Sequence, residues 1–186
     1  MRYLFLVLCT TLILGCSDAP KPEASVPTRD SAATDADFDL CNSYHTAVVD
    51  HHGADLSADN LPVAHRAVLL TWHAMGIIDN GGFQYLFEGD FEGDPGFALT
   101  ADAFDEIECK PAADAVRAAI ALFPDGGVPT DIDKRLELFQ ATPESKRNEL
   151  NSKFWAASDV GKGDVCVKLA TYIRNNSDAF SELNPE

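Results

Sequence analysis

The chain has 186 residues, of which 30 are acidic and 14 are lysine or arginine, so its formal net charge is −16. This length suffices for one domain with a buried core. The negative charge argues against direct binding of nucleic acid or anionic lipid and favours a basic protein partner, although solubility alone would also account for it.

The first fifteen residues have the pattern of a bacterial lipoprotein signal peptide. Arg2 provides the positive charge, and the apolar run after it is too short to span a bilayer. The run ends at Gly15-Cys16, which resembles a lipobox, so Cys16 is the predicted lipidation site and membrane anchor. Ser17 follows the cysteine, which by resemblance to lipoprotein sorting rules implies the outer membrane of the cell envelope, facing the periplasm. An ordinary secretory peptide is the alternative.

Residues 16–36 are predicted to form the lipidated cysteine and a flexible tether, because they are small, polar and proline-bearing and show no hydrophobic period. The folded domain is predicted to span residues 37–186. It contains Cys41, Cys109 and Cys166, which can pair in three ways in an oxidising compartment. The sequence does not choose among these pairings.

The first predicted helix covers residues 38–52, where apolar side chains recur at helical steps, and Gly53 ends it. His45 and His52 lie in this helix, and His65 and His73 follow in the next. None of these histidines has another at the i, i+4 spacing that helical metal sites use. We therefore predict no metal and no cofactor bound by histidine.

The second predicted helix begins at Asn60 as N-cap, with Pro62 in the first turn. Asp79-Asn80-Gly81-Gly82 is predicted to end it, because two glycines permit positive φ angles. A helix–helix turn is the favoured interpretation of this break, and a catalytic or ligand-binding loop is the alternative. The apolar face of the helix consists of Leu61, Ala64, Val68, Trp72 and Met75.

An acidic loop follows, with carboxylates at alternate positions: Glu88, Asp90, Glu92 and Asp94. Gly93 stands sixth from Glu88, as glycine does in a calcium loop, but the twelfth position is Leu99 rather than glutamate. The four acids are thus weak calcium candidates, and a solvated acidic loop is the alternative.

Further helices are predicted over residues 100–109, 111–123, 130–141, 142–155 and 165–173, from apolar side chains at helical steps separated by proline and glycine. Thr130 and Asp133 resemble a capping box at the start of one of them. Alternating strand patterns are nearly absent. The sequence therefore predicts a single compact all-α domain of six to eight helices.

The segment Asp79-Asn80-Gly81-Gly82-Phe83, followed by Gln84-Tyr85-Leu86-Phe87, resembles the signature of a bacterial helical family. This family, formerly a domain of unknown function, is named after the C-terminal domain of a DNA-mimic protein. The order of the later Phe154-Trp155 and Tyr172-Ile173 is also similar, and the resemblance covers residues 61–180. It implies an acidic helical domain whose carboxylates imitate the phosphates of a duplex, and it brings no catalytic residues.

Three functions follow as hypotheses. The favoured one is a membrane-tethered, non-enzymatic interaction module for a basic protein, without direct nucleic-acid binding. The second is a hydrolase that uses carboxylates or a bound cation near Asp79 and the acids of residues 88–94. The third is true DNA mimicry, in which the domain occupies a DNA-binding protein.

Overall fold

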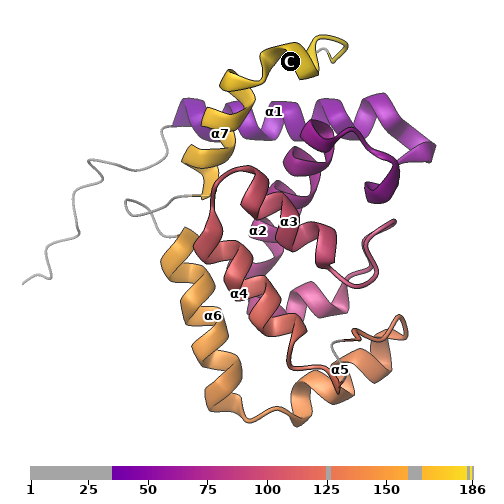
Figure 1. Cartoon of the computed structure of the whole chain (residues 1–186), viewed down its shortest axis with the longest axis vertical. Helices are drawn as coiled ribbons and strands as arrows, with labels where there is room; N and C mark the ends of the chain where they lie inside the picture. Colours follow the sequence, from indigo (N-terminus) through magenta and orange to yellow (C-terminus); the bar gives the residue numbers. More distant parts are fainter. Residues whose placement is uncertain (1–34, 125–126, 159–164, 184, 186) are drawn as a thin grey trace, which may run out of the picture.

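The computed structural model describes residues 35–124, 127–158, 165–183 and 185, and within them the chain forms seven α-helices and no β-strand (Figure 1). The prediction of an all-α domain of six to eight helices is confirmed. The helices are α1 (Asp35–His52), α2 (Val63–Glu88), α3 (Ala98–Glu106), α4 (Lys110–Ile120), α5 (Ile132–Ala141), α6 (Glu144–Ser158) and α7 (Val165–Asn175).

Helix α2 is the central element of the fold. It packs against α1, α3, α5, α6 and α7. In Figure 1 it runs through the middle of the molecule, with α1 and α7 above it and α5 and α6 below. Its buried side chains are mostly apolar, so every neighbouring helix covers part of one continuous core.

Aromatic side chains fill the core where α2 ends. The ring of Phe87 is fully buried, and its centroid lies 5.3 Å from that of Phe97, 4.9 Å from that of Phe123 and 5.1 Å from that of Phe139. All three pairs are edge-on, the geometry that the quadrupoles of aromatic rings favour. Phe87 therefore joins α2 to α5 and to the segments beside α3 and α4.

Two predicted helix starts were wrong by a few residues. Helix α2 begins at Val63 with Pro62 as its N-cap, and Asn60 instead ends a short 3-10 turn, η2 (Ala58–Asn60). At α5 the capping residue is Asp131, whose carboxylate accepts a hydrogen bond of 2.7 Å from the backbone N–H of Lys134. At α5 the neighbouring polar residues Thr130 and Asp131 compete for the same cap, and small shifts of the backbone decide between them. At α2 the N-cap Pro62 makes no side-chain capping bond.

The predicted signal peptide, the lipidation site Cys16 and the tether lie outside the described residues, apart from the last two tether residues, which begin α1. Within the described part of the chain, no helix combines the length and apolar character needed to cross a membrane.

The structure brings two of the three cysteines in its described residues together. The Cys41 thiol on α1 donates a hydrogen bond of 3.5 Å to the backbone carbonyl of Cys166 on α7, and both side chains are buried. Burial and the neighbouring Cys166 thiol raise the pKa of Cys41, with the contact to Cys166 as the largest cause. All three cysteines are reduced thiols in this structure, and Cys41 with Cys166 is the pairing whose residues it places in contact.

We predict that the unfolded chain, refolded with oxidised glutathione as disulfide donor, forms a Cys41–Cys166 disulfide. Two thiols are oxidised and one glutathione disulfide is reduced to two glutathione thiols, so the exchange balances. Non-reducing peptide mapping should find the peptides of α1 and α7 linked, and Cys109 open to alkylation after denaturation. The Cys109→Ser variant should keep the link and Cys41→Ser should lose it. A link to Cys109 in the wild-type chain would contradict the prediction.

Candidate functional site

Gly82 breaks α2 into two halves, residues 63–81 and 83–88. Its backbone has φ 69° and ψ −166°, a region that essentially only glycine occupies. A Cβ atom on Gly82 would also lie 2.5–2.7 Å from the side-chain amide of Asn151 on α6. The break that the sequence predicted is therefore real, although it occupies one residue rather than a loop, and the two halves adjoin directly.

Gly81, just before the break, serves a different purpose. A Cβ at this position would overlap the ring of Tyr85, which covers Gly81 from the second half of the helix. Glycine here lets the tyrosine ring lie flat against the backbone. Because the ring is half-exposed, it forms part of the protein surface rather than of the core.

One face of α6 stabilises the polar groups that the break leaves unpaired. The side-chain oxygen of Asn151 accepts a hydrogen bond of 2.9 Å from the backbone N–H of Phe83, as an N-cap residue would. The indole N–H of Trp155 donates to the backbone carbonyl of Ile78, at 3.2 Å. The hydroxyl of Ser158 donates to the carboxylate of Asp79, at 3.2 Å. These three residues recur at helical steps, so α6 holds the break in place.

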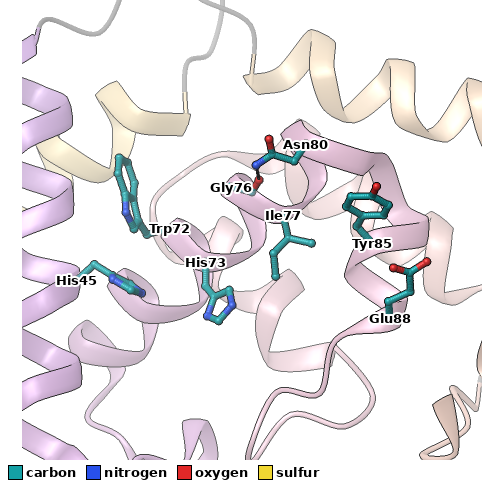
Figure 2. Close-up of a pocket in the computed structure, with 8 residues that line it drawn as sticks. All are labelled: His45, Trp72, His73, Gly76, Ile77, Asn80, Tyr85 and Glu88. Carbon is teal, nitrogen blue, oxygen red and sulfur yellow. Dashed lines mark hydrogen bonds between the residues drawn. The ribbon is translucent and has the colours of Figure 1, made fainter.

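A groove of about 510 Å³ opens beside the break, between α1 and the two halves of α2. Figure 2 shows Tyr85 and Glu88 together at one end of the groove, His45 and Trp72 at the other, and Ile77 between them. The volume lies in the range of small-ligand sites. The lining residues are His45, Trp72, His73, Gly76, Ile77, Asn80, Tyr85 and Glu88.

The two histidines of the groove favour their neutral form. Burial lowers the pKa of His73 and of His45 below the ordinary histidine value, and the nearby His73 lowers the pKa of His45 further. Nε2 of His45 is buried and has no hydrogen-bond partner among the described residues. Besides these two histidines, Glu88 is the only acidic or basic side chain among the described residues that line the groove.

Two of the three remaining histidines, His52 and His65, form a structural pair at the end of α1. Nε2 of His65 lies 3.0 Å from the carbonyl of Ala179, which can only accept, so this nitrogen carries the hydrogen. Nδ1 of His65 then accepts from Nε2 of His52, at 2.9 Å. Burial lowers the pKa of His52, and His65 and His51 lower it further. This pairing explains the fully buried His65 without a metal.

The four weak calcium candidates do not meet at one point. The carboxylate of Asp90 accepts a hydrogen bond from Arg135 on α5, at 3.0 Å, and Glu88 accepts one from Gln84, also at 3.0 Å. Across the part of the chain that the structure describes, no three side chains of His, Cys, Asp or Glu are grouped to hold a metal ion.

Asp94, the last of these acids, holds the start of α3. One carboxylate oxygen accepts from the backbone N–H of Leu99, at 3.0 Å, and the other accepts from the N–H and hydroxyl of Thr100, both at 2.7 Å. Burial raises the pKa of Asp94, while the hydrogen bonds from Thr100 and Leu99 act in the opposite direction. With both oxygens engaged inside the protein, Asp94 is a capping residue.

The acidic residues are distributed unevenly along the domain. Residues 35–109 contain fifteen acidic side chains and a single lysine or arginine, Arg66, whereas residues 110–186 contain twelve acidic and ten basic ones. The net charge of the first segment is thus −14 and that of the second is −2. Nearly all of the negative charge belongs to α1, α2, α3 and their connections.

Part of this charge forms a row on α1. Asp35, Asp39 and Asp50 are exposed and follow one face of the helix, because steps of four and eleven residues return to nearly the same direction. Among the described residues none of the three has an ion pair with lysine or arginine. At 1.5 Å per residue, Asp39 and Asp50 are about 16 Å apart along the axis.

Comparison with protein families agrees with this architecture. The family described as DMP19-like protein matches residues 59–176, from η2 to the end of α7. The chain belongs to the DMP19-like protein family. The resemblance to the DNA-mimic family inferred from residues 79–87 is confirmed, and the chain contains a DNA-mimic-like domain. Neither the curated proteins nor the solved structures that were compared gave a match.

The structure gives each residue of the predicted signature a local role. Asp79 and Phe83 bond to α6, Gly81 and Gly82 permit the break, and the Asn80 side-chain N–H donates to the carbonyl of Gly76, at 2.6 Å. Sequence reasoning missed the groove itself. Trp72 was assigned to the apolar face of the second helix, and the available signal for a groove was the tyrosine four residues after Gly81.

Proposed function

We propose that this chain is a membrane-tethered, non-enzymatic binding module whose acidic surface holds a basic protein. The observation that carries the proposal is the charge of residues 35–109, which contain fifteen acidic residues and one arginine. Asp39, Asp50 and Asp55 in this segment are exposed and have no lysine or arginine partner among the described residues. Such a surface attracts basic proteins and repels nucleic acid.

Where the domain acts depends on its predicted leader. A lipid on Cys16 and a tether to residue 36 would hold the domain at the outer membrane, facing the periplasm. The partner would then be a basic protein of the cell envelope. No enzymatic role is proposed, because the acids that a hydrolase would require have separate structural partners at Arg135, Thr100 and Ser158.

The test uses the full chain in detergent micelles, with an oligo-arginine peptide and a neutral glycine–serine peptide of equal length as probes. Calorimetry should detect binding of oligo-arginine alone, and its affinity should fall as salt is added, because exposed charges are screened. Absence of oligo-arginine binding at low salt would refute the proposal.

A matched pair of variants locates the surface. Asp39→Asn, Asp50→Asn and Asp55→Asn together remove three charges from the first segment. Because each exposed contact contributes up to about 1 kcal/mol, they should weaken oligo-arginine binding by about tenfold. The control removes three exposed charges from the second segment, at Asp133, Glu144 and Asp178, and should change affinity by about twofold or less. Equal losses would show that overall charge, rather than this surface, governs binding.

True DNA mimicry is a second candidate, favoured by the family and by the row of carboxylates on α1. It predicts that the chain releases a fluorescent duplex from a sequence-independent DNA-binding protein. The α1 variant Asp35→Asn with Asp39→Asn and Asp50→Asn should lose this activity, and the second-segment control should keep it. Failure to release the duplex, with oligo-arginine binding intact, would leave only the first candidate.

A further inference from the structure

We propose that the groove beside the helix break receives an arginine side chain of the basic partner. This inference rests on the proposed function and specifies where the partner's most selective contact is made. It concerns the end of the groove formed by Tyr85 and Glu88, which lie together in Figure 2.

The tyrosine offers a flat face to a cation. Its ring is 50% exposed and is held against the backbone of Gly81, where any larger residue would displace it. A guanidinium group stacks on such a face with its charge over the ring. The arrangement has little rotational freedom to lose on binding, because the ring is already seated on the helix.

Glu88 provides the matching charge. It stands one turn after Gln84, whose side-chain N–H donates to one of its carboxylate oxygens at 3.0 Å and so fixes the carboxylate near Tyr85. A guanidinium stacked on the tyrosine could donate to this carboxylate, the pairing for which arginine geometry is best suited. No lysine or arginine of the described segments lines the groove to compete for Glu88.

The rest of the groove suits the apolar stem of an arginine. Trp72 and Ile77 line it, and the Trp72 ring is braced by an edge-on contact with Phe38, at 4.9 Å between centroids. His45 and His73 favour the neutral form and therefore do not repel an incoming cation. A lysine would also reach Glu88, but its compact ammonium lacks the planar face that stacks on an aromatic ring.

The test compares oligo-arginine with oligo-lysine of equal length, both binding to the full chain in detergent micelles. The wild-type chain should prefer oligo-arginine by about threefold to fivefold, as expected for one exposed cation–π contact. Glu88→Gln should weaken oligo-arginine binding by about threefold to fivefold. Tyr85→Leu should remove the preference for arginine over lysine.

Glu92→Gln is the matched control for Glu88→Gln, since it removes one exposed charge from the same loop outside the groove and should leave the arginine preference unchanged. Melting temperatures verify that each variant is folded.

If oligo-arginine binds but the groove variants behave like the control, the groove inference fails and the proposed function stands. If oligo-arginine does not bind at all, both fail. A chain with Lys21→Gln and Arg29→Gln whose preference for oligo-arginine over oligo-lysine rises would assign the groove to its own tether and overturn the partner assignment, because general charge attraction is the same for both peptides.

Discussion

Replacing Gly82 by alanine is expected to lower the free energy of unfolding by about 2–4 kcal/mol. Alanine is strained by about 1–3 kcal/mol at the φ and ψ of Gly82. Its Cβ would also push away the side-chain amide of Asn151, which costs the capping bond to Phe83 a further ~1 kcal/mol. Urea unfolding followed by circular dichroism measures the change.

Gly76→Ala is the matched control for this prediction. Gly76 lies in the same helix, and a Cβ there would meet nothing within 4 Å. Alanine at this position should stabilise the domain by up to about 1 kcal/mol, because it favours the helix. An unchanged stability of the Gly82→Ala variant would contradict our account of the break.

The partner residue on α6 offers a second control. Asn151→Ala removes both the cap and the atoms that an alanine at position 82 would strike. The double variant should therefore lose less stability than the sum of the two single losses, because it has no clash and loses the capping bond only once. Strict additivity would show that Asn151 and Gly82 act independently.

Replacing Asp90 by alanine is the second change with a large expected effect, a loss of about 2–4 kcal/mol. Arg135 is 0% exposed, and its guanidinium donates to Asp90 and to the backbone carbonyl of Gly89, both at 3.0 Å. Without Asp90, a buried positive charge lacks its counter-charge, which is among the costliest single defects. The Asp90 side chain is itself 67% exposed, so solvent moderates the loss.

The compensating variant distinguishes this explanation from a general effect of the loop. Arg135 is fully buried and its guanidinium lies over the ring of Phe97, at 5.3 Å from the centroid, a position that suits an apolar side chain. Asp90→Ala combined with Arg135→Met should recover most of the lost stability, because no unpaired charge remains. If the double variant is less stable than Asp90→Ala alone, the ion pair is not the cause. Thermal and urea unfolding both measure the stability of the single and double variants.

The contacts of Asp90 illustrate why the sequence left the role of the acidic loop open. Alternating carboxylates and a glycine are local features, and both a calcium loop and a capped loop display them. Gly93 does adopt a positive φ of 79°, as the pattern required. A Cβ there would strike residues of η2, however, so the turn serves close packing of the loop. The role of the loop follows from its hydrogen-bond partners in the folded chain, Arg135 for Asp90 and Thr100 for Asp94.

The sequence by itself determined the helical class, the break at Gly82 and the family. Apolar side chains at steps of three and four encode helices locally, and a paired glycine signals a break without knowledge of the rest of the chain. Only the tertiary structure decided which residues of α6 bond to the break and that a groove opens beside it. Asn151 and Phe83 are 68 positions apart, and Trp155 and Ile78 are 77 apart, so no local pattern could pair them. The groove has the same origin, because its walls come from α1 and both halves of α2, which meet only when the core is packed.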